Sequence, residues 1–358
     1  MEKLYTIKAG KKAKEIISDK GLCADDIEII AGASGGPKWL VLAGIDDHLP
    51  GFIEKRKSSA PVHLIGSSIG SWRLAAYASK ESQKALKNFE INYKAQVYKG
   101  RPTAKEVSDE SKKILSNYLS EEDKNHIINH PFMKLHIITA LSRGIGAFDN
   151  SLFLGPHLGI TYLLNLLSRP LSNKCFKGIH FTTSKNEAPF ETNLLVEKGS
   201  IELSVENIQD AILASGSIPL VMEGIKNIDG APQGMYRDGG LIHYHLDLSF
   251  KTADEKIVLY PHFYDYIVPG WFDKSIPKPR YHQHPKDNVV LISPSEKFIN
   301  TLQLKRIPDR TDFKYFYKRD DERFAWWDSV TDLSREMAKE LFDDVSRGIN
   351  KDSIELLT

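Results

Sequence analysis

Two short apolar runs, each closed by a glycine and followed by a helical pattern, constrain the fold of this chain most strongly. IEIIAG at 27–32 precedes PKWLVLAGIDDHL, and VHLIGS at 62–67 precedes IGSWRLAAYASK. Short runs rich in Ile and Val predict buried strands, and Pro37 suits the first turn of a helix. Strand–turn–helix units in series are typical of a parallel sheet covered by helices. We therefore predict an α/β fold with a central, mainly parallel sheet.

The rest of the chain continues this alternation of short apolar runs and helical patterns. We expect further strands at 134–141, 177–184, 256–263 and 288–293, and helices over most of 82–130, at 151–167, before Gly216 and at about 321–347. The final helix has apolar residues at a spacing that puts them on one face. Its apolar residues are Phe324, Val330, Leu333, Met337, Leu341 and Val345.

Composition excludes several classes of protein. The 358 residues carry a net charge of +1, so no broad field attracts nucleic acid, and we expect no nucleic-acid partner. The first residues lack the apolar core of a secretory signal, and Cys23 and Cys175 form no paired motif, which favours a reducing compartment. The run at 151–167 contains Pro156, His157 and Asn165 and is too interrupted to span a bilayer. We expect a cytoplasmic protein that contacts a membrane only peripherally.

The turn after the second strand has the pattern of a nucleophilic serine. Gly66-Ser67-Ser68-Ile69-Gly70 matches G-x-S-x-G between a strand and a helix, where a serine sits on a strained turn with its hydroxyl exposed. The glycines prevent collisions where the strand and the helix nearly touch. Such a serine needs a base and donors for the oxyanion. The plain alternative is a tight glycine turn without chemistry.

Two further glycine-rich turns can supply those needs. In AGASGGPKW, Gly35 and Gly36 leave backbone N–H groups open at a helix start, which suits an oxyanion or a phosphate. The spacings of the known nucleotide-binding loops are not matched. In YRDGGLIHYHLD, Asp238 precedes two glycines that allow a close backbone approach, so its carboxylate can accept a proton from the serine. Taken singly, each is also a common turn.

Together these pieces resemble the patatin-like phospholipase family, which orders a glycine-rich oxyanion loop, G-x-S-x-G and D-G-[GA] along the chain. A fourth stretch, ILASGSIPLVM, resembles the A-S-x-A-x-P segment of that family, with Ser217 in place of an alanine. The resemblance covers about residues 26–247. Ser34 and Trp39 replace glycines of the family loop, and Tyr244 and Leu246 stand where the family often has Asn and Pro, so the chain looks like an outlying, bacterial-type branch.

The resemblance implies a three-layer patatin-like domain over 26–300, with a C-terminal helical extension over 301–358 packed on it. It also implies a serine lipid acyl hydrolase that cleaves carboxylic esters through a Ser–Asp dyad and an acyl-enzyme, without cofactor or metal. Acyl transfer to another acceptor stays open. In the implied site the nucleophile is Ser68 and the general base is Asp238. The oxyanion hole is formed by Gly35, Gly36 and Lys38. Gly66 and Gly70 form the tight turn around the nucleophile, and Gly239 and Gly240 support the aspartate.

Two rival functions remain at this level. His243, His245 and Asp247 alternate, so on a strand they would share one face and could hold a metal ion, which would make the protein a metal-dependent hydrolase. His243 could instead lie near the dyad and tune it. The second rival function is that of a non-catalytic family member that binds lipid.

Two segments are candidates for contact with a lipid substrate or a membrane surface. The stretch 261–279 concentrates aromatic residues among prolines, which is typical of an interfacial or lid loop but also of a loop packed on the core. Its aromatic side chains include that of Trp271. The uncharged run 151–167 is expected to line an acyl pocket, with Leu163 facing the acyl chain.

Overall fold

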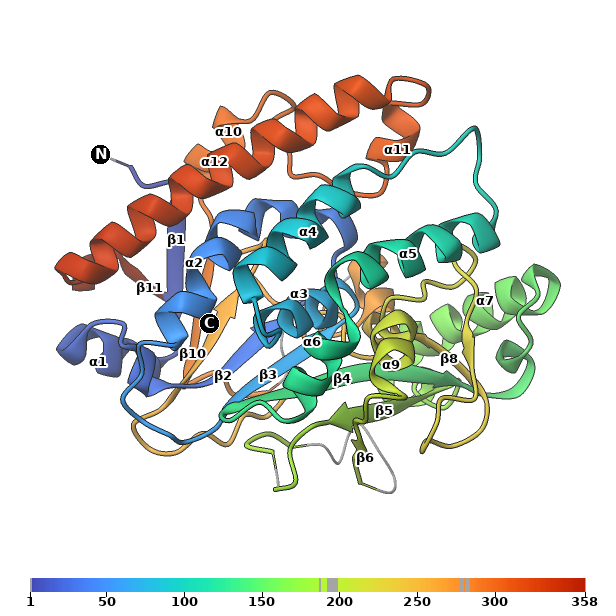
Figure 1. Ribbon diagram of the computed structural model, residues 1–358, viewed down its shortest axis with the longest axis horizontal. Coiled ribbons are helices and arrows are strands. Elements are labelled where there is room, and N and C mark those ends of the chain that lie inside the picture. Colours follow the sequence, from blue (N-terminus) through green and yellow to red (C-terminus); the bar gives the residue numbers. More distant parts are fainter. Residues whose placement is uncertain (1, 187, 192–198, 277–279, 281–283, 358) are drawn as a thin grey trace.

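The computed structural model describes residues 2–186, 188–191, 199–276, 280 and 284–357 (Figure 1). Its centre is a sheet of 11 strands flanked by helices. The neighbours β10, β9, β2, β3 and β4 run parallel to one another, whereas β1 is antiparallel to β10 and β5 is antiparallel to β4. The predicted α/β class with a mainly parallel central sheet is confirmed.

The strands at the predicted positions form, and others are added at both edges of the sheet and beside β4. The order across the sheet is β11-β1-β10-β9-β2-β3-β4-β5-β6, with β8 joined to β4 and β7 to β8. The strands are β1 (Tyr5–Ala9), β2 (Ile27–Gly32), β3 (Val62–Ser67), β4 (Met133–Ser142), β5 (Phe176–Thr182), β6 (Ile201–Glu202), β7 (Ile225–Lys226), β8 (Met235–Asp238), β9 (Ile257–Pro261), β10 (Val289–Pro294) and β11 (Ile354–Leu356).

The helices include every one that the sequence patterns predict. The α-helices are α1 (Lys11–Lys20), α2 (Ala43–Ile53), α3 (Ile69–Tyr77), α4 (Ser82–Lys94), α5 (Ala104–Tyr118), α6 (Glu121–Ile128), α7 (Ser151–Leu167), α8 (Arg169–Ser172), α9 (Ile208–Ser215), α10 (Glu296–Thr301), α11 (Asp312–Tyr315) and α12 (Asp320–Arg347). The short 3-10 helices are η1 (Ala24–Asp26), η2 (Gly36–Leu42), η3 (Gly144–Ala147), η4 (Gly239–Leu241), η5 (Trp271–Ser275) and η6 (Lys351–Ser353).

One expected helix differs at its start. The sequence pattern predicts a single helix from Pro37, but this segment begins as η2 and becomes α-helical only at Ala43. The glycine-rich loop therefore spans the few residues between the end of β2 at Gly32 and the start of η2 at Gly36.

Helices cover the sheet in layers. Helix α3 packs on β2, β3 and β4, and α4 lies over α3 between α2 and α5. Figure 1 shows α1 and α7 at opposite ends of the sheet. A second, smaller apolar cluster contains Phe176 of β5, Leu241 of η4 and Phe272 of η5, with Tyr162 of α7 packed against it. This cluster fixes the segments that follow β8 and β9 against the sheet.

The C-terminal residues are part of the same core. Helix α12 packs on α2 and η2, and Trp326 and Trp327 are both buried. Strand β11 pairs in parallel with β1 at the edge of the sheet. In the described part of the chain, no helix combines the length and the apolar character needed to cross a bilayer.

The long strand β4 brings together the ends of β3 and β8. Both strands pair with the same edge of β4, β3 along its first half and β8 along its second half. Ser67 lies opposite Ile138, and Asp238 lies opposite the next residue, Thr139. Because β3 and β8 run in opposite directions, their carboxyl ends meet head to head. The residues that follow Ser67 and those at Asp238 therefore converge at one point.

Candidate active site

The turn at Ser68 has an unusual backbone conformation. Ser68 follows β3 directly and has φ 54° and ψ −128°, a conformation that residues with a side chain adopt rarely. Such a conformation costs on the order of 1–3 kcal/mol and persists only where the surroundings enforce it. Ser68 is 5% exposed, and its hydroxyl faces a cavity. The turn thus places the Ser68 hydroxyl at the cavity.

Close packing explains the two glycines around this turn. A Cβ atom on Gly66 would lie 2.5 Å from Cα of Ser71, and a Cβ atom on Gly70 would lie 2.0 Å from the carbonyl oxygen of Gly32. Both distances are far below van der Waals contact, and the obstructing atoms belong to the backbone. The G-x-S-x-G spacing is therefore a packing requirement of the β3–α3 junction with β2.

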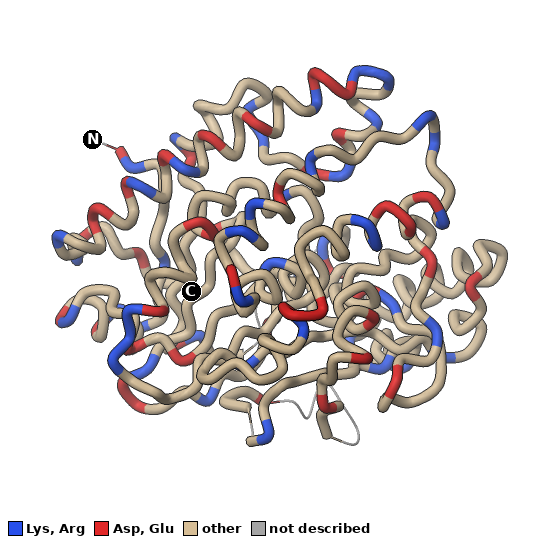
Figure 2. Tube along the Cα trace, viewed as in Figure 1, with Lys and Arg blue, Asp and Glu red and all other residues tan. Residues whose placement is uncertain are grey.

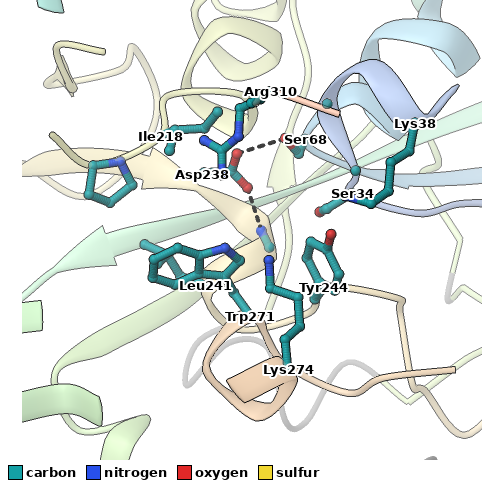
Figure 3. Close-up of a pocket in the computed structure, with 14 residues that line it drawn as sticks. Ser34, Lys38, Ser68, Ile218, Asp238, Leu241, Tyr244, Trp271, Lys274 and Arg310 are labelled. Carbon is teal, nitrogen blue, oxygen red and sulfur yellow. Dashed lines mark hydrogen bonds between the residues drawn. The ribbon is translucent and has the colours of Figure 1, made fainter. Parts of the chain in front are cut away.

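Asp238 is the hydrogen-bond partner of Ser68. The Ser68 hydroxyl donates to Oδ2 of Asp238 at 2.7 Å, and the N–H of Gly240 donates to Oδ1 at 2.7 Å (Figure 3). Gly239 lies between them at the start of η4. Burial raises the pKa of Asp238 to about 6, although both hydrogen bonds and the nearby Arg310 and Lys274 act to lower it. At neutral pH the carboxylate is therefore ionised yet basic enough to accept a proton.

Ser215 positions the turn, a role that the sequence patterns did not reveal. The hydroxyl of Ser215, at the end of α9, accepts the N–H of Ser68 at 2.9 Å and donates to the carbonyl of Ile138 at 2.6 Å. The N–H of Asp238 donates to the carbonyl of Ser217 at 3.0 Å. The segment ILASGSIP therefore holds both ends of the Ser68–Asp238 pair. Its resemblance to a family segment was the available signal.

The glycine-rich loop after β2 lies beside Ser68. Gly36 begins η2 with φ 55°, and Gly35 precedes it. The hydroxyl of Ser34 donates to that of Ser67 at 3.0 Å, and the N–H of Ser34 donates to the carbonyl of Tyr244 at 2.9 Å. Ser34 thus joins the loop to β3 and to the segment after η4. Gly35 and Gly36 line the same cavity as Ser68, so their backbone N–H groups are candidates to bind an oxyanion.

A cavity of about 50 Å³ opens above the pair. Three cationic side chains line it, and Figure 3 shows Lys274 and Arg310 directed toward Asp238 from different sides. Neither residue was singled out from the sequence, since a lone Lys or Arg in a loop carries no pattern. The lining residues are Ser34, Gly35, Gly36, Lys38, Ser68, Ile218, Pro219, Asp238, Gly240, Leu241, Tyr244, Trp271, Lys274 and Arg310.

The alternating His243, His245 and Asp247 do not form the predicted strand face. The segment after η4 is irregular, so the geometry that would have aimed all three at one ion is absent. Asp247 instead pairs with Lys286 at 2.6 Å, and Nδ1 of His245 accepts the N–H of Val268 at 2.9 Å. Within the described ranges, no group of three or more His, Cys, Asp or Glu residues could hold a metal ion. His243 is buried and is not among the residues that line the cavity.

Only one of the two candidate lipid-contacting segments contributes described residues to the cavity lining. Of the aromatic stretch 261–279, whose residues 277–279 lie outside the described residues, Phe263 and Phe272 are buried and Trp271 lines the cavity. In contrast, no residue of α7 lines the cavity in the part of the chain that the structure describes. Leu163 is 61% exposed, so the expectation that it faces an acyl chain inside a pocket is wrong. The apolar pattern of 151–167 predicted the helix but not which side of it is covered.

Comparison with known proteins identifies one family. The model of the family described as patatin-like phospholipase matches residues 30–244, which is more than half of the chain and includes Ser68 and Asp238. A search among curated proteins finds no match. The match ends before η5 and before the loop that carries Arg310, so two of the three cations at the cavity lie outside it.

Proposed function

The chain belongs to the patatin-like phospholipase family, and we propose that it is a serine lipid acyl hydrolase that works through a dyad of Ser68 and Asp238. The observation that carries the proposal is the 2.7 Å hydrogen bond from the Ser68 hydroxyl to Oδ2 of Asp238, beside a cavity. Family membership supports a hydrolase that acts on lipid esters. The residue roles and the acyl-enzyme are the parts that we add.

In this mechanism Asp238 takes the proton of Ser68 as the serine oxygen attacks the ester carbonyl. The negative charge on the carbonyl oxygen is bound by the N–H groups of Gly35 and Gly36, with Lys38 adding positive charge. Asp238 then gives its proton to the departing alcohol, which leaves an acyl group on Ser68. Water then attacks this ester while Asp238 accepts one of its protons. As the bond to the serine oxygen breaks and the fatty acid leaves, Asp238 returns that proton to Ser68.

Covalent labelling tests this mechanism. A fluorophosphonate should modify Ser68, and Ser68→Ala should abolish both labelling and hydrolysis of a soluble short-chain ester. Asp238→Asn should reduce both rates by orders of magnitude because the serine loses its base. Ser116→Ala, which removes an exposed serine of α5, is the matched control and should retain both. Labelling at another residue, or a fully active Ser68→Ala protein, would contradict the dyad. Absence of both labelling and hydrolysis in the unchanged protein would instead favour a non-catalytic lipid-binding member.

We further propose that α7 rests on the membrane surface that presents the lipid. Six large apolar residues of this helix are exposed, and its 17 residues carry no Asp, Glu, Lys or Arg. The helix adjoins the cavity through η5, where the Tyr162 hydroxyl donates to the carbonyl of Ser275 at 3.1 Å. Exposed Leu220 and Val221 follow Pro219 of the cavity lining. The exposed apolar residues of α7 are Leu152, Phe153, Ile160, Leu163, Leu166 and Leu167.

Charged substitutions on α7 test the membrane contact. A protein with Leu163→Asp and Leu167→Asp should bind neutral phosphatidylcholine vesicles about tenfold more weakly, because charged groups resist entry into the interface. Its kcat/KM on a soluble short-chain ester should be unchanged. Leu356→Asp, at a residue 55% exposed on β11, is the control and should bind vesicles normally. If the protein with both α7 substitutions binds vesicles as tightly as the unchanged protein and the Leu356→Asp control, the proposed contact is contradicted.

A further inference from the structure

The cavity at Ser68 is positively charged by side chains that have no ion-pair partner in the described part of the chain. Lys38, Lys274 and Arg310 line it, and in the described ranges the only carboxylate in the lining is that of Asp238. Over the whole molecule positive and negative residues are interspersed, with a net charge of +1 (Figure 2). The excess of positive charge at the cavity is therefore local. The carboxylate of Asp238 already accepts hydrogen bonds from Ser68 and Gly240, so the cations of the lining remain available to bind a further anion.

Arg310 forms no ion pair with a described residue, although acidic residues lie beside it in the same loop. The carboxylate of Asp309 accepts the N–H of Thr311 at 2.7 Å and its hydroxyl, and Asp312 accepts from Arg306 and from Nε1 of Trp327. Asp312 is thus engaged by Arg306, and Asp309 by the neutral donors of Thr311, so the charge of Asp309 still attracts Lys38 and Lys274 from nearby. No ion pair of Arg310 is found among the described residues. Its side chain passes over Gly36, within 3.4 Å of the position of a Cβ atom there. Arg310 therefore lines the cavity beside the glycine-rich loop.

Lys274 shows the same arrangement on the other side of the mouth. Its ammonium lies 4.5 Å from the ring centre of Tyr244 and 5.3 Å from that of Trp271, so aromatic faces hold it in place. The adjacent Asp273 is engaged by Arg280 at 3.0 Å, and in the described ranges no carboxylate pairs with Lys274. Crowding by protein and the nearby Lys38 and Arg310 lower the pKa of Lys274 to about 8. A bound anion would relieve this repulsion.

We propose that Lys274 and Arg310 form an anion-binding subsite, which selects esters that carry a phosphate or carboxylate group close to the scissile carbonyl. The inference rests on the proposed hydrolase function and names its substrate class. The subsite is small and adjoins Ser68, so the anion must be only a few bonds from the ester. Both residues lie beyond the segment that the family model matches, so the subsite is a property of this chain's C-terminal third.

Two soluble esters that differ only in a phosphate test the subsite. Lysophosphatidic acid and monoacylglycerol with the same short acyl chain are compared by kcat/KM, and we expect at least tenfold preference for the phosphate ester. Arg310→Gln and Lys274→Gln should each reduce that preference, taken as the ratio of the two kcat/KM values, about tenfold, as expected for loss of one charge-assisted hydrogen bond. The ratio cancels any effect of the lost charge on Asp238, which both substrates share. Lys314→Gln, which removes an exposed charge of α11 outside the cavity, should change neither rate.

A binding measurement separates this inference from the hydrolase mechanism. Inorganic phosphate is titrated calorimetrically into Ser68→Ala protein, which needs no catalysis, and binding should be lost when Arg310→Gln is added. If phosphate binds but the preference for the phosphate ester is absent, the site holds free anions only and the substrate assignment is overturned. If the preference persists unchanged in both Gln variants, the subsite is wrong. Absence of fluorophosphonate labelling at Ser68, with phosphate binding retained, would overturn the hydrolase proposal and the substrate assignment that rests on it, but not the anion-binding site.

Discussion

At the scale of single residues, the central quantity is the charge state of Asp238. Its carboxylate is held by the Ser68 hydroxyl and the Gly240 N–H, and burial raises its pKa to about 6. A raised pKa means that the carboxylate is a better proton acceptor than an exposed aspartate. The ionised form is the base, so activity should be lost as the pH falls through the pKa.

The pH dependence of kcat/KM should therefore have an acid limb for every substrate. We expect the rate on a neutral soluble ester to rise with pH up to about 6 and then to level off, because kcat/KM reports the ionisation of the free enzyme. For a phosphate ester a second limb should appear, in which the rate falls above pH of about 8 as Lys274 loses its proton.

The control for this prediction is the Lys274→Gln protein, which should lack the alkaline limb while keeping the acid limb. A neutral ester whose hydrolysis stays constant from pH 8 down to pH 4 would contradict the assignment of Asp238 as the base. An alkaline limb of equal size on both substrates would show that Lys274 does not act through the anionic group.

At the scale of elements, the end of α9 determines whether the Ser68 turn can form. The N–H of Ser68 is buried, and the hydroxyl of Ser215 is its acceptor. The same hydroxyl is tied to β4 through Ile138, so one side chain links α9, β4 and the β3–α3 turn. A strained turn is maintained only by such surrounding contacts.

Ser215→Ala should consequently impair both stability and catalysis. Leaving a buried N–H without an acceptor costs about 1–3 kcal/mol, and we expect a lower urea midpoint together with at least a tenfold loss of kcat. KM should change little, because Ser215 is not in the cavity lining.

The matched control for this change is Ser217→Ala, two residues away. The Ser217 hydroxyl donates only to the carbonyl of Leu213 within the helix turn, at 2.9 Å, and its backbone contact with Asp238 is kept. Its kcat should stay within about twofold of the unchanged protein. Equal losses in the two variants would show that Ser215 has no special positioning role.

At the scale of the whole molecule, the C-terminal helix α12 packs behind the glycine-rich loop that lies beside Ser68. Helix α12 lies against η2 and α2, and the Ser334 hydroxyl donates to the carbonyl of Val41 at 2.7 Å and accepts the N–H of Gly44 at 3.0 Å. A Cβ atom on Gly44 would lie 2.2 Å from the carbonyl oxygen of Ser334, which allows no side chain there. The glycine-rich loop before η2 is therefore held from behind by residues far along the chain.

Gly44→Ala should destabilise the protein by about 1–3 kcal/mol in urea unfolding, because the two helices must separate to admit a methyl group. Activity should fall as well, since η2 carries the loop beside Ser68. Gly51→Ala in the same helix is the control: no atom lies within 4 Å of its Cβ position, and alanine there should stabilise by about 0.5–1 kcal/mol. An unchanged urea midpoint for Gly44→Ala would contradict the tight α2–α12 contact.

Local sequence patterns determined the elements of this fold. Apolar runs such as IEIIAG and VHLIGS predicted β2 and β3, because a buried strand must be apolar along its whole length. The apolar spacing near the C-terminus predicted α12 within one residue of its start. Strands β1 and β11 were not predicted, since they lie at the edge of the sheet and form only where distant partners supply the pairing. The G-x-S-x-G and D-G-G motifs marked Ser68 and Asp238 because glycine spacing is a local requirement of tight turns.

Tertiary structure alone decided how distant residues combine at the site. Ser68 and Asp238 are 170 residues apart, and their contact depends on two strands that share one edge of β4. Arg310 and Lys274 reach the cavity from segments without a motif, since a single cation in a loop has the same local pattern whether it faces solvent or a substrate. The exposure of α7 is likewise set by what packs on it. The local sequence determines which segments can form turns, strands or buried helix faces. Which distant residues lie close together is determined by the packing of the whole molecule.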